Sequence, residues 1–326
     1  LSANTTGTRN AAIGNSALDA GATDVDNTAV GDLAMTSNNG GDYNTGIGGR
    51  ALHNNTTGNE NTAVGYGAGS GHTTGANNVA VGVNTLRVAT TSSSNTGLGH
   101  SALYGNTTGA NNTAVGKSAL AANTTGAENV AVGVSSLASV TTASENTAVG
   151  RGALIYTTGS WNTAVGHNAA DNLTTGNHCA SFGHNATPSS AGVGNQMTLG
   201  DGNIHNLRCA DTSISTLSDQ RDKTNVVDIP LGLSFINTVR PVSFVWDRRD
   251  GIQRPFSNKD FGFIAQELKT AADATDYADH MRLVQDDNPD KLEADPMKMF
   301  PILVKAIQEL STENEALKAR LTAGGL

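Results

Sequence analysis

The first two thirds of the chain repeat a short pattern of apolar and polar positions. The pentapeptide Asn-Thr-Ala-Val-Gly and its close variants end in glycine at Gly14, Gly31, Gly48, Gly65, Gly82, Gly99, Gly116, Gly133, Gly150, Gly166, Gly183 and Gly200. The step is 17 residues throughout, except for 16 between Gly150 and Gly166. Such a period is too short for a pair of helices and is typical of one coil of a β-solenoid. We therefore predict a mainly β solenoid of 17-residue coils over residues 1–200.

Two neighbouring positions of the repeat predict which side of each strand is covered. The residue before the glycine is aliphatic in all but one repeat, as at Val30 and Ile47, and is expected in the coil interior. The residue before that is tiny in all but the last repeat, as at Ala29 and Gly46, and strand alternation sends it to the opposite face. That small face is expected to contact another subunit, because a single thin solenoid buries little apolar area.

Two further features of the repeat predict local structure. A second apolar pair, such as Ala102-Leu103 or Ala119-Leu120, is interpreted as a second short strand of each coil. An asparagine starts the repeated pentapeptide in most coils, as at Asn27 and Asn44, and is expected to stack into a ladder of side-chain amides.

After residue 200 the repeat stops and the pattern becomes that of an α+β domain. Leu233–Val239 predicts a short helix, and Pro241–Trp246 a strand after it. Phe261–Leu268 predicts a strand that runs into a helix, and Pro301–Leu310 opens a long helix. We expect a connector at 201–217 and a separate domain at 218–326.

The last helix carries a heptad pattern typical of a coiled coil from about residue 297. Its a positions are Phe300, Ile307, Asn314 and Leu321, and its d positions are Leu303, Leu310 and Leu317. A core asparagine such as Asn314 fixes register at some cost in stability. The pattern itself does not choose between two strands and three.

Composition limits the function classes. The net charge is −9, which does not favour binding to nucleic acid. The sequence contains no apolar run of 18 residues, so membrane insertion is not predicted. The two cysteines, Cys179 and Cys209, give neither a disulfide framework nor a CxxC pair. We expect no metal and no cofactor. Five aromatic residues of the repeat could stack on sugars, although a structural role is favoured for each: Tyr43, Tyr66, Tyr104, Tyr156 and Trp161.

Candidate chemistry lies at the start of the C-terminal domain, in Ser218-Asp-Gln-Arg-Asp-Lys223-Thr. By itself this segment is a plausible turn or helix cap. Together with the Phe-x-Trp strand, the Gly-Phe-x-Ala-Gln-Glu segment and the Ala-Ile-Gln-Glu-Leu helix, it resembles the self-cleaving intramolecular chaperones of phage endosialidases and tail fibres. Residues 10–200 resemble the β-roll repeats of trimeric adhesin heads.

The chaperone resemblance implies a homotrimer and cleavage of the Leu217–Ser218 bond. It implies Ser218 as the nucleophile and Lys223 as its base. A serine needs such a base, and a lysine serves when burial favours its neutral form. The expected protein is a viral fibre segment of the virion that attaches to a host glycan or protein. A bacterial surface adhesin stalk, and an uncleaved chaperone that stays as a permanent cap, are the alternatives.

Overall fold

The computed structural model describes residues 1–204, 218–245, 259–290 and 292–324. The chain divides into two compact units, Leu1–Asp201 and Gly202–Leu326, and each is described by itself. The predicted connector at 201–217 and the predicted strand that ends at Trp246 lie partly outside the described residues, and Leu217 lies wholly outside them.

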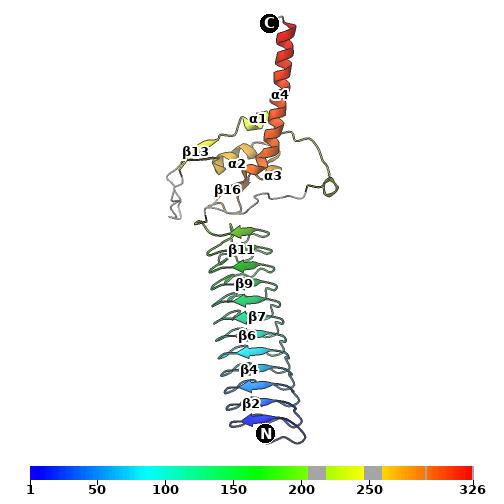
Figure 1. Ribbon diagram of the computed structural model, residues 1–326, viewed down its shortest axis with the longest axis vertical. Helices are drawn as coiled ribbons and strands as arrows, with labels where there is room; N and C mark the ends of the chain where they lie inside the picture. Colours follow the sequence, from blue (N-terminus) through cyan, green and yellow to red (C-terminus); the bar gives the residue numbers. More distant parts are fainter. Residues whose placement is uncertain (205–217, 246–258, 291, 325–326) are drawn as a thin grey trace, which may run out of the picture. The chain divides into compact units, whose positions relative to one another are not determined.

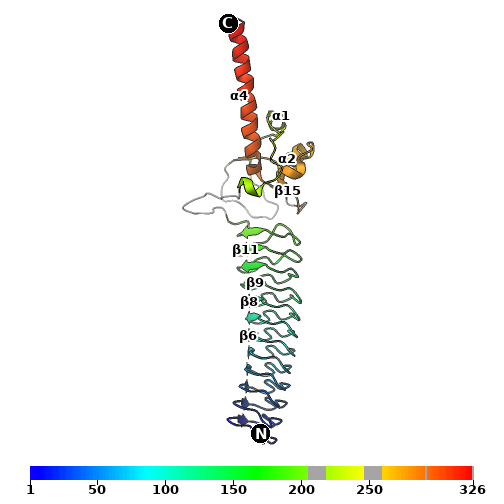
Figure 2. The same ribbon diagram turned by 90° about the vertical axis from the view of Figure 1, so that its right-hand side faces the viewer.

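The first unit is a solenoid whose three-residue strands stack in chain order as one parallel sheet (Figures 1 and 2). Partners are 17 residues apart, except that Thr147 pairs with Thr163. This confirms the predicted β-solenoid. The strands are β1 (Ala11–Ile13), β2 (Thr28–Val30), β3 (Thr45–Ile47), β4 (Thr62–Val64), β5 (Val79–Val81), β6 (Thr96–Leu98), β7 (Thr113–Val115), β8 (Val130–Val132), β9 (Thr147–Val149), β10 (Thr163–Val165), β11 (Ala180–Phe182) and β12 (Met197–Leu199).

The predicted orientation of the strands was wrong. The tiny residue points into the coil, and Ala29 and Ala114 are fully buried. The aliphatic residue points outward, where Ile47 is 40% and Leu98 46% exposed. The outer ends of the strands therefore carry an apolar stripe along the solenoid, and the small residues do not face another subunit.

The reason is that a different position fills the coil. Leucines four residues after the repeat glycine, such as Leu103 and Leu120, are fully buried and leave room only for a small residue opposite. Two strands carry glycine instead, where Met35 replaces the usual leucine or Thr85 replaces the alanine before it. A Cβ atom on Gly46 would lie 2.9 Å from Met35 Cγ, and one on Gly97 would lie 2.6 Å from Thr85 Cγ2.

The second strand predicted for each coil was also wrong, because this segment forms turns. Leu103 has φ of 52°, in the left-handed region. Ala102 and Leu103 are both fully buried, whereas successive residues of a strand point to opposite faces. The turns still bond from coil to coil, as Leu103 N donates to Ala119 O at 3.0 Å.

The predicted asparagine ladder is confirmed. The backbone N–H of Asn44 donates to Asn27 Oδ1 at 2.8 Å, and Asn61 N donates to Asn44 Oδ1 at 3.0 Å. The amide nitrogen of Asn44 donates to Gly58 O at 2.8 Å. Each of these side chains is buried, so the ladder satisfies polar groups that the thin coil removes from water.

The second unit is a small α+β region. It contains η1 (Gln220–Asp222), α1 (Leu233–Ile236), β13 (Val242–Phe244), β14 (Asp260–Gly262), α2 (Ala265–Asp273), α3 (Ala278–Met281), β15 (Val284–Gln285), β16 (Glu293–Ala294), η2 (Pro296–Met299) and α4 (Phe300–Ala323). Strand β13 pairs antiparallel with β14, and β15 with β16. Phe235, Leu268, Leu283 and Ile302 lie at the centre of the core. The predicted helix, strands and long C-terminal helix are confirmed.

Candidate functional site

Ser218 and Lys223 lie in contact at the start of the second unit. Lys223 Nζ donates a hydrogen bond to Ser218 Oγ at 2.7 Å. The two side chains suggested for nucleophile and base are thus within the distance over which a proton can pass. Leu217, on the other side of the expected cleavage bond, lies outside the described residues.

A short turn brings the two side chains together. The Asp219 carboxylate caps helix η1 by accepting from Arg221 N at 2.9 Å, and Lys223 N donates to Gln220 O at 3.1 Å. The same carboxylate also accepts a hydrogen bond from the Arg221 guanidinium, whose Nη2 lies 2.6 Å from Asp219 Oδ2. These hydrogen bonds hold the pKa of Asp219 below its usual value. The sequence suggested a cap or a catalytic serine here, and the turn contains the cap beside the serine.

The serine and the lysine are both exposed in the single chain. A lysine acts as a general base only through its neutral amine, and burial is what favours that form. The turn therefore supplies the distance that nucleophilic activation needs. It does not supply the burial.

Helix α4 has two apolar faces, and the described residues of the chain cover one of them. Ile302 and Ala306 are buried, and Ile302 belongs to the unit's own core. The heptad positions are exposed, with Ile307 at 64%, Leu310 at 48% and Leu317 at 54%. Asn314 is exposed among them, and Leu321 is 54% exposed.

Comparison with protein families gives a match that begins at the candidate serine. Residues 218–280 match the family described as chaperone of endosialidase. This segment is therefore similar to that family, and the part of the chain from Ser218 onward is called the chaperone domain from here on. The family is a self-cleaving, serine-peptidase type of chaperone. Searches of curated proteins and of solved structures gave no match.

Two residues of the chaperone domain explain motifs whose role the sequence left open. Glu309, from the Ala-Ile-Gln-Glu-Leu motif, accepts from Leu233 N at 2.7 Å and so caps helix α1 from helix α4. A Cβ atom on Gly232 would collide with the Glu309 carboxylate. Glu267, from the Gly-Phe-x-Ala-Gln-Glu segment, forms an ion pair with Arg240, which precedes β13. No spacing rule could have found either contact, because the partners lie 76 and 27 residues apart.

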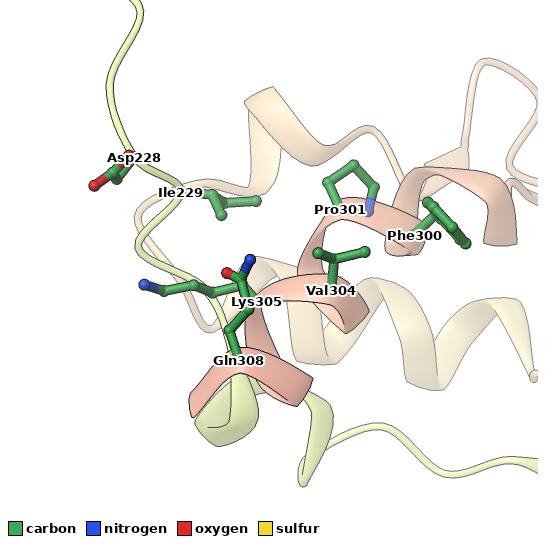
Figure 3. Close-up of a pocket in the computed structure, with 7 residues that line it drawn as sticks. All are labelled: Asp228, Ile229, Phe300, Pro301, Val304, Lys305 and Gln308. Carbon is green, nitrogen blue, oxygen red and sulfur yellow. The ribbon is translucent and has the colours of Figure 1, made fainter. Parts of the chain in front are cut away.

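A shallow pocket lies between the chain at Asp228–Ile229 and the first turns of α4 (Figure 3). Phe300, Pro301 and Val304 supply its apolar wall, while Lys305 and Gln308 close one end. Phe300 is 65% exposed. Its described lining residues include no serine, threonine or cysteine, and Ser218 is not among them.

The described residues hold no group of three or more His, Cys, Asp or Glu side chains that could bind a metal ion. Among those same residues, no helix has both the length and the apolar character to span a membrane.

Proposed function

We propose that the chain is a homotrimeric fibre segment of a phage that serves host attachment. Its chaperone domain aligns three copies and then cuts itself off at the Leu217–Ser218 bond. The hydrogen bond between Ser218 and Lys223 is the observation that carries this proposal.

The chemistry follows from the position of Ser218 beside the scissile bond. Its Oγ attacks the Leu217 carbonyl carbon while Lys223 Nζ accepts the hydroxyl proton. Collapse of the tetrahedral intermediate breaks the bond between the Leu217 carbonyl carbon and the Ser218 nitrogen. The proton held by Lys223 then passes to the departing α-amino group of Ser218. Water then hydrolyses the resulting Leu217 ester, which leaves a Leu217 carboxylate and a free Ser218 hydroxyl.

Assembly supplies the burial that a single chain lacks. Removing a lysine from water favours its neutral form, which is the form that accepts a proton. The exposed heptad face of α4 offers a seam for the other copies, with Ile307 and Leu310 in its core and Asn314 fixing the register. Cleavage thereby waits until three chains are aligned.

The apolar stripe of the solenoid, here meaning the outward aliphatic residues of β1–β12, is the contact face that we propose between the fibre parts of the three copies. It contains no charged residue in any strand. Leu98 and Val132 are 46% and 36% exposed. Monomeric proteins rarely leave so long an apolar surface in water, so a second and a third copy are its natural cover.

Intact mass of the purified chain, beside that of Ser218→Ala, tests self-cleavage. We expect two fragments that join at Leu217–Ser218 in the wild type and one uncut chain in the variant. Lys223→Arg should also stay uncut, because arginine remains protonated. An uncut wild-type trimer would contradict self-cleavage and support the alternative of a chaperone that stays as a permanent cap. Cleavage of Lys223→Arg at the normal rate would refute the step in which neutral Lys223 accepts the proton.

Light scattering tests the oligomer. We expect the mass of three chains for Ser218→Ala, and loss of that state when Ile307 and Leu310 are both changed to Asp. A wild-type monomer that still cuts itself would contradict the role of assembly.

A further inference from the structure

A groove crosses one face of the solenoid at the coils that follow β3, β4 and β5. Its volume is about 530 Å³. The side chains that matter for binding come from three successive coils: Arg50 and His53, then Tyr66 and Thr73, then Asn84 and Arg87. This face is separate from the apolar stripe, because its residues belong to the turns after the repeat glycines.

The groove exists because the middle coil departs from its neighbours. Gly67 and Gly71 occupy the positions that carry Arg50 and Asn54 in the coil before. A Cβ atom on Gly67 would lie 2.8 Å from Asn84 Oδ1, and one on Gly71 would lie 2.5 Å from the Arg87 carbonyl oxygen. Both glycines therefore lie where a Cβ atom would press on the next coil, and neither adds a side chain to the groove.

The groove is cationic in an acidic protein. The lining residues include two arginines and no carboxylate, whereas the whole chain has a net charge of −9. Neither arginine forms an ion pair with any residue that the structure describes, although Arg9 on another coil is paired with Asp26 at 2.6 Å. Two guanidinium groups thus keep donors available for an outside anion.

Neighbouring groups position one of these cations. Arg87 Nη1 donates to Asn84 Oδ1 at 3.3 Å, and its guanidinium carbon lies 6.0 Å from the centre of the Tyr104 ring. Tyr66 is 55% exposed, and its ring packs over Gly49 of the preceding coil, where a Cβ atom would lie 3.3 Å from Tyr66 Cδ2. One aromatic ring is thus held at the groove with part of its surface open to solvent.

We propose that this groove binds an acidic saccharide. Arg50 and Arg87 bind its carboxylate or sulfate groups, Tyr66 packs against a sugar ring, and Asn84 and Thr73 bond to hydroxyl groups. A nucleic acid fits less well, because the two arginines are not part of a longer basic row and the solenoid up to residue 201 has only five lysines and arginines. The proposal deepens the host-attachment role proposed above, and it is independent of self-cleavage.

The test uses the full chain as the uncleaved Ser218→Ala protein and measures binding by calorimetry. The probes are oligogalacturonate, which carries carboxylates, sulfated dextran, and neutral dextran. We expect at least one acidic probe to bind and neutral dextran not to bind. The acidic probe that binds tells carboxylate from sulfate recognition.

Variants then place the site. Arg50→Gln with Arg87→Gln should weaken binding at least tenfold, and Gly71→Val should do so without a change of charge. Lys117→Gln, which removes an exposed cation outside the groove, is the matched control and should bind as before. Circular dichroism checks that each variant keeps its solenoid.

Three results would overturn the proposal: no binding of either acidic probe, equal loss in Lys117→Gln, or no loss in the double arginine variant. Because cleavage is blocked throughout, none of these outcomes bears on the chaperone. Conversely, binding of an acidic probe by a chain that proves monomeric would support the saccharide site and contradict the proposed homotrimer.

Discussion

The imidazole ring of His72 occupies the space beside Gly69 that a leucine side chain fills in other coils. A Cβ atom on Gly69 would lie 3.1 Å from His72 Nδ1 and 3.0 Å from Leu52 Cδ2. The preceding and following coils carry Leu52 and Leu86 at this position. His72 Nδ1 lies 3.2 Å from the Gly69 carbonyl oxygen, while its Nε2 is buried without a hydrogen bond.

This burial predicts acid sensitivity of the solenoid. Desolvation lowers the pKa of His72 from 6.5 to about 4. Between these values the unfolded chain binds a proton that the folded chain does not, so stability falls as the pH is lowered from 6.5 toward 4. The loss approaches about 3 kcal/mol at the lower end. Hydrogen exchange of the amides between residues 65 and 90 at pH 7 and pH 5 measures it.

His72→Asn should remove this part of the pH dependence, whereas His100→Asn, at an exposed position, should retain it. The carboxylates of the chain titrate in both variants and cancel in the comparison. Equal acid sensitivity in the wild type and His72→Asn would show that the ring is not the cause.

The Gly69–His72 relationship also predicts strong coupling between two substitutions. Gly69→Leu alone should destabilise the coil, because the leucine meets the ring. His72→Asn alone leaves a void, although its amide could reach the unpaired Asn55 Oδ1. Together they restore the arrangement of the preceding coil, which carries Leu52 and Asn55, so the double variant should be more stable than the sum of the two changes, by about 1–3 kcal/mol. Additive changes in a thermal-unfolding cycle would contradict the shared space.

Asp219→Asn should slow self-cleavage by about tenfold or more, because misplacing a nucleophile and its base is costly. The carboxylate holds the turn that brings Lys223 to Ser218. Asp222→Asn removes the same charge within the turn and is the control. The rate is followed on denaturing gels after refolding, and equal rates in the two variants would exclude a positioning role.

Glu309→Ala should destabilise the chaperone domain by about 1 kcal/mol, since helix α1 loses its cap. Glu313→Ala, one turn further along α4, should have little effect. Gly232→Ala should be damaging in the wild type and much less so beside Glu309→Ala, because its Cβ atom meets the carboxylate. Thermal unfolding of the four proteins checks this, and an unchanged penalty for Gly232→Ala would contradict it.

Val115→Lys with Val132→Lys should lower the melting temperature of the assembled protein by roughly 5 °C or more, or dissociate it, if the apolar stripe is covered by other copies. Thr108→Lys with Thr125→Lys places the same charges at exposed turn positions of two successive coils and should change little. Similar melting of the two variants would mean that the stripe faces water.

The period of the repeat was enough to predict the solenoid and the asparagine ladder, because each depends on one residue type recurring at one spacing. It was not enough to orient the strands. Ala29 and Val30 point to opposite faces of the strand whichever of them faces the coil interior. The leucines that fill the coil determine that the small residue faces inward. Those leucines lie in left-handed turns that an apolar pair such as Ala102-Leu103 does not reveal.

In the chaperone domain, the elements followed from the local sequence pattern, whereas the pairing of Ser218 with Lys223 was implied by the resemblance to self-cleaving chaperones. The Glu309 cap and the Arg240–Glu267 pair followed from neither, since folding brings these partners together from distant segments. The groove at Gly67 and Gly71 was also missed. Its signal was present in the sequence as one coil that lacks the side chains of its neighbours.

The constant register of the strands makes the fibre length adjustable. A coil bonds only to the coil before and the coil after it, so removing one 17-residue block, such as Gly116 to Val132, would bring together two coils that can pair just as well. Genetic gain or loss of such blocks would change the reach of the fibre in increments of about 4.8 Å. The coil that carries Gly67 and Gly71 is the exception, because replacing it with another coil would remove the groove.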